Sequence, residues 1–366
     1  MNLVQAHLVY IMITGINKLI KLIPLRIQKI FLGSAFISFL KAIVGIGIIS
    51  ILSNSNTGSL TLYGNLQNLL TILIAFLGLS IQNGISDYVA RKDRLNQASQ
   101  IKDYLFTALF IGSFLLCTVY LATKFFFQAK LNTLILFQDL SPIVLVIALC
   151  GVLHLYYRAI MVGKGFVVFG QSLDLLRSSV ILLSLFLYLI YDSKINIYSV
   201  IFFGYLIIIP FILLALFKSL SFKPKIRIDK NLSKIIKTGL ITGYSGILLS
   251  VISIAIRSFA VDEGGYSLSD SWELSIKLLL VFQVVMIAPL SQILLRTYAL
   301  ADSRKPLTLF KKAIPFVFLV PIFMALIPSS FYVELLLLLF SMEIPGFKMI
   351  FIIMIIGETF RVLGTF

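Results

Sequence analysis

Apolar runs of about twenty residues recur from one end of this 366-residue chain to the other. A helix needs about 20 apolar residues to cross a hydrocarbon core about 30 Å thick. The composition agrees, because 59% of the residues are hydrophobic and 13% are charged, against roughly 45–50% and 25% in soluble domains. We therefore predict an all-α, polytopic integral membrane protein and exclude soluble enzymes, secreted disulfide scaffolds and disordered chains. The ten predicted spans are residues 31–51, 62–86, 103–123, 140–161, 173–191, 197–217, 238–260, 272–295, 310–328 and 347–366.

Basic residues gather on one side of this arrangement. If the amino terminus lies inside, most of the 31 Lys and Arg residues fall in inner loops, whereas the outer loop 261–270 carries Asp262, Glu263 and Asp270. The positive-inside rule then predicts a cytoplasmic amino terminus. It also accounts for the net charge of +16 without nucleic-acid binding.

Residues 1–30 do not fit the span pattern, because the apolar stretch 8–16 is short and basic residues follow it. In a signal peptide the basic residues precede the apolar stretch. We predict a cytoplasmic segment that lies on the inner leaflet. An upstream extension from a misassigned start is the alternative.

The two parts of the chain resemble each other. A gap-free shift that places Tyr63 on Trp272 also superposes a span, an inner charged turn and the following span, and it aligns Leu69 with Leu278, Ala90 with Ala299, Asp93 with Asp302 and Lys102 with Lys311. The shift predicts parallel copies about an axis along the membrane normal. We predict a six-helix lobe at 31–219, a basic cytoplasmic linker at 220–237 and a second lobe at 238–366.

In this register the second lobe has four spans and lacks its last two helices. The alternative is a genuine ten-span protein. We expect a chain of this length to fail in transport until two further spans are appended, because alternating access rocks one lobe against the other.

Charges inside apolar runs indicate functional sites, because each costs at least ~2.5–3.5 kcal/mol on insertion scales. Lys41 lies in the middle of the first span, and Arg177, Arg257 and Lys277 lie nearer to span ends, where snorkelling is the alternative. Asp174 has the i, i+3 spacing for a pair with Arg177, and Glu358 and Arg361 have the same spacing. The remaining buried charges are mostly positive. They predict a cavity for anions, above all diphosphates, which arginine grips with two hydrogen bonds.

A polar stretch, residues 80–88, ends the second span, and the shift places Pro289 opposite Ser80. Helix interruptions at matching places in two halves indicate gating elements. The candidate gating residues are Gln82, Asn83, Gly84, Asp87, Tyr88 and Pro289.

No cofactor or metal is expected. Gly163-Lys164-Gly165 lacks the glycine spacing and the Ser/Thr of a phosphate-binding loop. Cys150 and His154 share a helix face, but a zinc site needs further ligands.

Several segments resemble Wzx-type flippases of the multidrug/oligosaccharidyl-lipid/polysaccharide exporter (MOP) superfamily. Lys41 is similar to a first-span lysine, and Trp272 to a tryptophan that opens the eighth span. Other similar segments are Lys164-Gly165-Phe166, Gly357-Glu358 with Arg361, and Ser80-Ile81-Gln82-Asn83-Gly84-Ile85-Ser86-Asp87-Tyr88-Val89-Ala90.

The resemblance implies a two-lobed, twelve-span flippase and not an enzyme. Its substrate would be an O-antigen or related oligosaccharide linked to undecaprenyl diphosphate, as for lipid III flippases. Transport would cross the bacterial inner membrane, with membrane lipids and a polysaccharide polymerase and ligase as partners. A multidrug/cation antiporter of the same fold, or a membrane polymerase or ligase, is the alternative.

Overall fold

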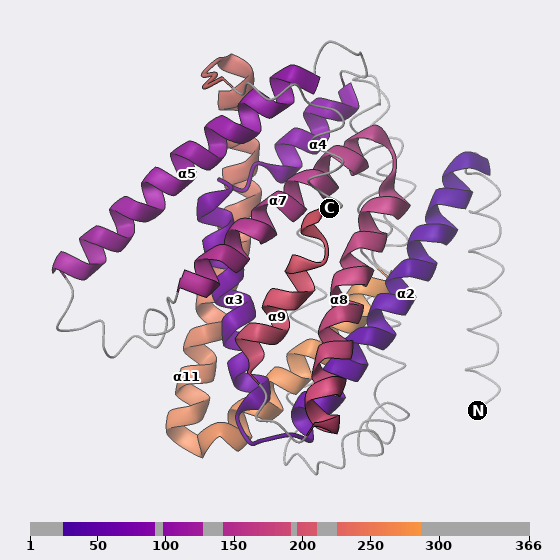
Figure 1. Ribbon diagram of the computed structural model, residues 1–366, viewed down its shortest axis with the longest axis vertical. Coiled ribbons are helices and arrows are strands. Elements are labelled where there is room, and N and C mark those ends of the chain that lie inside the picture. Colours follow the sequence, from indigo (N-terminus) through magenta and orange to yellow (C-terminus); the bar gives the residue numbers. More distant parts are fainter. Residues whose placement is uncertain (1–24, 92–97, 127–141, 192–195, 211–224, 287–366) are drawn as a thin grey trace, which may run out of the picture.

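The computed structural model describes residues 25–91, 98–126, 142–191, 196–210 and 225–286, and within these ranges the regular elements are helices without any strand (Figure 1). Five helical segments of this part are long and apolar enough to cross a membrane. The prediction of an all-α, polytopic membrane protein is therefore confirmed. In chain order the helices are α2 (Leu25–Ser53), α3 (Ser59–Leu77), α4 (Gln82–Arg91), α5 (Ala98–Phe126), α7 (Pro142–Lys164), α8 (Val167–Ile190), α9 (Ile197–Leu206) and α11 (Lys230–Met286).

Several predicted spans coincide with helices. The first, third, fourth and fifth spans correspond to α2, α5, α7 and α8, and α9 begins where the sixth span was predicted. Asn196 starts α9, because its side chain accepts hydrogen bonds from the backbone N–H groups of Tyr198 and Ser199. The ninth and tenth spans, Pro289 and nearly all of the segment 1–30 lie outside the described residues.

The second span is not one continuous helix. α3 ends at Leu77 and α4 begins at Gln82, and between them Leu79 and Ser80 both adopt the left-handed conformation, with φ of 48° and 49°. Such strain costs on the order of 1–3 kcal/mol for each residue, so surrounding contacts must hold it. The Tyr156 hydroxyl donates to the Gly78 carbonyl at 2.9 Å, and Gly243 of α11 leaves room for the Ser80 side chain. The helix interruption expected at Ser80 is present.

The predicted outer loop 261–270 is reduced to a break at one residue. α11 continues through these residues except at Gly265, whose φ of 71° and ψ of −174° separate two helical segments. Asp262 and Glu263 are exposed, but Asp270 is buried. Its carboxylate accepts hydrogen bonds from the backbone N–H groups of Gly58 and Thr61, at 2.6 and 2.7 Å. Asp270 therefore caps the start of α3 and does not lie in a loop.

The second segment of α11 lies along α3. The repeat shift makes Thr61 equivalent to Asp270 and Gly64 equivalent to Glu273, and both pairs are in contact. The two-lobed repeat itself stays a prediction. α3 also packs on α2, α5, α7 and α9.

A tight turn sets α7 beside α8. Gly165 has a left-handed φ of 88°, and the backbone N–H groups of Gly165 and Phe166 donate back to Val162 and Met161. This is the Schellman arrangement that ends a helix at glycine. Because the two helices then run antiparallel, residues about two turns before and after the turn face each other.

Large apolar side chains cover the outer surface of the bundle. Phe36 on α2, Phe110 and Phe114 on α5, and Phe186 on α8 are all more than half exposed. On a soluble protein these side chains would form adhesive patches. Their exposure suits contact with lipid tails.

Candidate functional site

A cavity of about 400 Å³ lies where α3, α8, α9 and the first segment of α11 meet. Gly243, Gly246 and Ile247 line it from α11, so residues far apart in the sequence contribute to its wall. Its polar lining residues are Tyr63, Gln67, Thr71, Ser80, Gln82, Arg177, Ser178 and Tyr205.

Arg177 is the cation in this lining. Its Nη1 donates to the Tyr205 hydroxyl at 2.8 Å, and its guanidinium carbon lies 4.9 Å from the centre of the Tyr205 ring. Its Nε atom is buried and finds no hydrogen-bond partner among the described residues. The predicted i, i+3 pair with Asp174 is wrong, because Arg177 turns to α9 instead.

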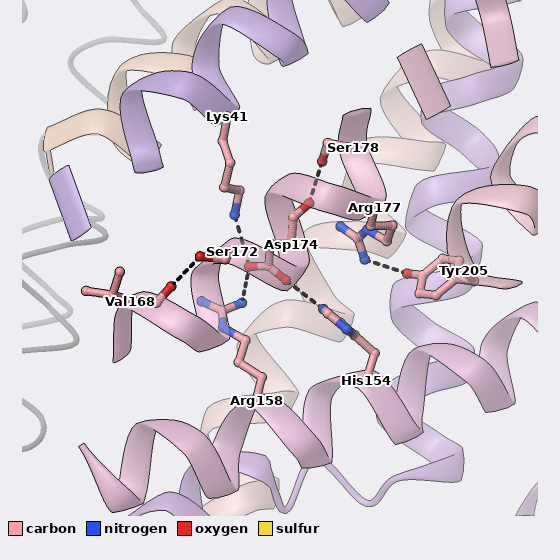
Figure 2. Close-up of polar contacts among 9 residues, drawn as sticks. All are labelled: Lys41, His154, Arg158, Val168, Ser172, Asp174, Arg177, Ser178 and Tyr205. Atoms are coloured by element: carbon pink, nitrogen blue, oxygen red, sulfur yellow. Dashed lines mark hydrogen bonds and ion pairs between the residues drawn. The ribbon is translucent and has the colours of Figure 1, made fainter. Parts of the chain in front are cut away.

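Asp174 is surrounded by basic groups from two other helices (Figure 2). Its Oδ2 atom lies 3.0 Å from Lys41 Nζ of α2 and 2.9 Å from Arg158 Nη1 of α7. Its Oδ1 atom lies 2.6 Å from His154 Nε2, also of α7. These four residues form the Asp174 cluster. The turn at Gly165 creates it, since it places Arg158 opposite Asp174.

Lys41 was predicted to be an unpaired cation, and this is wrong. A lone ammonium at membrane depth is costly, and the Asp174 carboxylate removes that cost. His154 and Arg158 were not predicted as site residues, because their span, 140–161, contains no acidic residue that could pair with them. Their i, i+4 spacing on one helix face is the signal that could have joined them.

Arg257 and Lys277 also share a carboxylate. Arg257 Nη1 lies 2.6 Å from Glu273 Oε2, and Lys277 Nζ lies 3.3 Å from Glu273 Oε1. Lys277 also donates to Gln67 of α3. We call Arg257, Glu273, Lys277 and Gln67 the Glu273 cluster.

The prediction that Arg257 and Lys277 are unpaired cations of an anion cavity is wrong. Arg257 is fully buried, and both cations share the Glu273 carboxylate within the helix packing. Glu273 was not predicted as their partner, although it lies at the start of the predicted span 272–295. Its i, i+4 spacing to Lys277 is the missed signal.

The candidate gating residues lie in and beside α4. Gln82 lines the cavity, and Gly84 packs against the backbone of Ile235 in α11. The Tyr88 hydroxyl donates to Gln100 of α5 at 2.8 Å. Asn83 and Asp87 are partly buried in the same helix. A gating role for them stays a prediction.

The basic linker predicted at 220–237 is only partly a linker, because residues 230–237 already belong to α11. Residues 225–229 form a strap that lies on α5. The backbone N–H groups of Lys225 and Arg227 donate to Asp103 and Thr107 of α5. Asp229 accepts hydrogen bonds from Leu232 N–H, the Tyr104 hydroxyl and Arg227 Nε. Burial alone would raise the pKa of Asp229, but these hydrogen bonds stabilise its charge and hold the pKa below the ordinary value of 3.8.

Comparison with known proteins identifies the fold. The chain is similar to a solved structure described as the outward-facing conformation of a multidrug resistance transporter of the MATE family, in the MOP superfamily. The TM-score is 0.62 at 14% sequence identity, over 90% of this chain and 78% of that chain. No family model matches the chain, and no curated protein does. The chain therefore shares the overall fold of this solved transporter.

Proposed function

We propose that this protein is a flippase for an O-antigen or related oligosaccharide linked to undecaprenyl diphosphate, in a bacterial inner membrane. The transporter fold supports transport rather than catalysis. Membrane lipids, and the polymerase and ligase that process the exported oligosaccharide, are the partners that this function implies.

The observation that carries the proposal is the position of Arg177. Its guanidinium lines a cavity between helices that lie far apart in the sequence, and one of its N–H groups has no partner within the described part of the chain. A guanidinium matches the oxygens of a phosphate group with paired hydrogen bonds. Arg177 is therefore the residue that we expect to bind the diphosphate.

The distribution of membrane charge supports an anionic substrate. In the Asp174 cluster Lys41 and Arg158 share one carboxylate, and in the Glu273 cluster Arg257 and Lys277 share another. Arg177 adds a further positive charge beside the first cluster. The described membrane interior thus carries an excess of positive charge.

A multidrug/cation antiporter is the second candidate, because Asp174 is a buried carboxylate of the kind that could bind a cation. Both of its oxygens, however, already contact basic side chains. A cationic drug would have to displace Lys41 and Arg158 to reach Asp174.

Binding to the purified chain in lipid nanodiscs separates these candidates. Titrations with geranylgeranyl diphosphate and with tetraphenylphosphonium measure the affinity for each ligand class. Arg177→Gln should weaken diphosphate binding by about tenfold to a hundredfold, because hydrogen bonds to charged groups contribute about 1.5–3 kcal/mol. Arg177→Lys should bind with intermediate affinity.

Lys237→Gln is the matched control, since it removes one exposed positive charge of α11 away from the cavity. It should leave the affinity unchanged. Tight binding of tetraphenylphosphonium without binding of the diphosphate would overturn the flippase proposal.

A further inference from the structure

We propose that Lys41, His154 and Arg158 form a binding site for one phosphate group, and that the Asp174 carboxylate fills this site when no ligand is bound. The proposal rests on the proposed function for its ligand class, a lipid-linked diphosphate. Asp174 is then a positioning residue: its carboxylate keeps the three basic groups together until the ligand takes its place.

The geometry around Asp174 is that of an anion-binding site. Two cations converge on one carboxylate oxygen, at 3.0 and 2.9 Å, and an imidazole lies 2.6 Å from the other. The donors come from α2 and α7, whereas the carboxylate comes from α8 (Figure 2). A phosphate group presents three or more acceptor oxygens and can receive the same donors.

The accessible surface is on the basic side chains and not on the carboxylate. Lys41 and Arg158 keep 20% and 28% of their side-chain surface exposed, but Asp174 keeps 4%. An anion can therefore approach the two cations first. His154 adds a buried Nδ1 atom that has no hydrogen-bond partner in the described part of the structure.

The cluster lies within reach of one membrane surface. Arg158 is six residues before Lys164, where α7 ends, and Asp174 is seven residues after the start of α8. At 1.5 Å per residue these distances are about 9–10 Å along the helices. The nearby turn at Gly165 lies on the predicted cytoplasmic side, where a lipid-linked diphosphate would begin its passage.

Exchange of the Asp174 carboxylate for a phosphate group would break the ion pair between α2 and α8. Lys41 to Asp174 is the ion pair that joins these helices, and close contacts of Gly33 with Val168 and of Gly47 with Leu182 flank it. Small residues at a helix interface let the two backbones approach closely, so the ion pair lies within a tightly packed contact. Once a phosphate group holds Lys41, the two helices lose their ionic tie.

The test is Asp174→Asn with inorganic pyrophosphate as the probe, in titrations of the full chain in nanodiscs. We expect the variant to bind pyrophosphate at least about tenfold more tightly than the wild type, because the apparent affinity falls in proportion to the fraction of molecules whose site is open, and Asp174 closes the site in the wild type. Adding Lys41→Gln to the variant should abolish this gain. Asp229→Asn, the same change in a carboxylate that also pairs with an arginine, should show no gain.

Two further ligands identify the source of the phosphate group. A gain with farnesyl diphosphate as well as with pyrophosphate supports a lipid headgroup, and a gain with pyrophosphate alone supports a free phosphate compound. An equal affinity of the wild type and Asp174→Asn for both ligands would overturn the inference. The proposed function would still stand if geranylgeranyl diphosphate binding depended on Arg177.

A second measurement covers the case in which Asp174→Asn does not fold. The chain has two histidines, so His7→Asn leaves His154 as a single ¹⁵N-histidine NMR signal. Saturating pyrophosphate should shift this signal in an otherwise wild-type chain, because its partner changes from a carboxylate to a phosphate. An unchanged signal at saturation would contradict the exchange.

Discussion

The Asp174 and Glu273 clusters each hold one carboxylate between two cations, but they differ in what can reach them. In the Asp174 cluster the cations are a fifth or more exposed, and three helices contribute. In the Glu273 cluster Lys277 exposes 16% of its side chain, but Arg257 and Glu273 expose only 1% and 2%. An ion pair that water and lipid headgroups cannot reach cannot exchange its partner. The Arg257–Glu273 pair is therefore a contact that joins helices, whereas both cations of the Asp174 cluster are accessible to a ligand.

Position in the fold agrees with this distinction. Arg257 and Glu273 lie on the two segments of α11 and so tie the hairpin at Gly265, while Lys277 extends the contact to Gln67 of α3. Gly64 of α3 faces them, and its lack of a side chain leaves space for Glu273 and Arg257. The Glu273 cluster thus fixes how α11 lies on α3.

The largest expected effect is that of Glu273→Gln. Removing one partner of a buried ion pair leaves an uncompensated charge and costs about 3–5 kcal/mol. We expect a large loss of thermal stability in detergent, and pyrophosphate should not restore it. Asp174→Asn should also lose stability, but pyrophosphate should restore it. Equal recovery of both variants would remove the distinction between the clusters.

Gly64→Ala should have the next largest effect. The added methyl group would overlap the Glu273 carboxylate and the Arg257 guanidinium. Overpacking of this kind costs about 1–3 kcal/mol, and we expect it as a lower midpoint of thermal unfolding. Gly246→Ala is the matched control, because a methyl group there meets no atom within 4 Å. A stable Gly64→Ala variant would mean that the two parts do not pack this closely.

Thr61→Val should cost less, about 1–2 kcal/mol, because it removes a buried hydroxyl that bonds to Asp270 at 2.6 Å and to Ser269 at 2.9 Å. This change tests the contact between α3 and α11 without removing a charge. Thr118→Val is its control, since that exposed hydroxyl donates only within its own helix, to the Phe114 carbonyl. Similar unfolding midpoints for both variants would contradict a stabilising role for the Thr61 contact.

The sequence predicted the features that depend on local pattern. Span length and hydropathy predicted α2, α5, α7 and α8, and the polar stretch at Ser80 predicted the interruption between α3 and α4. Both signals act within one helix or its end. They do not depend on which helix is the neighbour.

The ion pairs could not be predicted in the same way, because their partners come from different helices. The i, i+3 spacing predicted a pair between Arg177 and Asp174. In the structure Asp174 instead contacts Arg158 and His154 of α7. Asp270 was assigned to an acidic loop, since nothing near it in the sequence indicates that it caps α3. The sequence shows which residues are charged, but the partner of each charge depends on how the helices pack.

The smallest expected effect concerns Asp229, a carboxylate that lies outside the membrane spans and is paired with Arg227 at 2.9 Å. Because hydrogen bonds outweigh burial and lower its pKa below 3.8, its charge stabilises the strap above about pH 4. This stabilisation is lost only as the pH falls through the lowered pKa. Hydrogen exchange of residues 225–232 should therefore show constant protection from pH 7 to about pH 4, and Asp229→Asn should weaken that protection throughout this range. A loss of protection in the wild type near pH 6 would contradict this pairing, and it would place the control of the strap in groups other than Asp229.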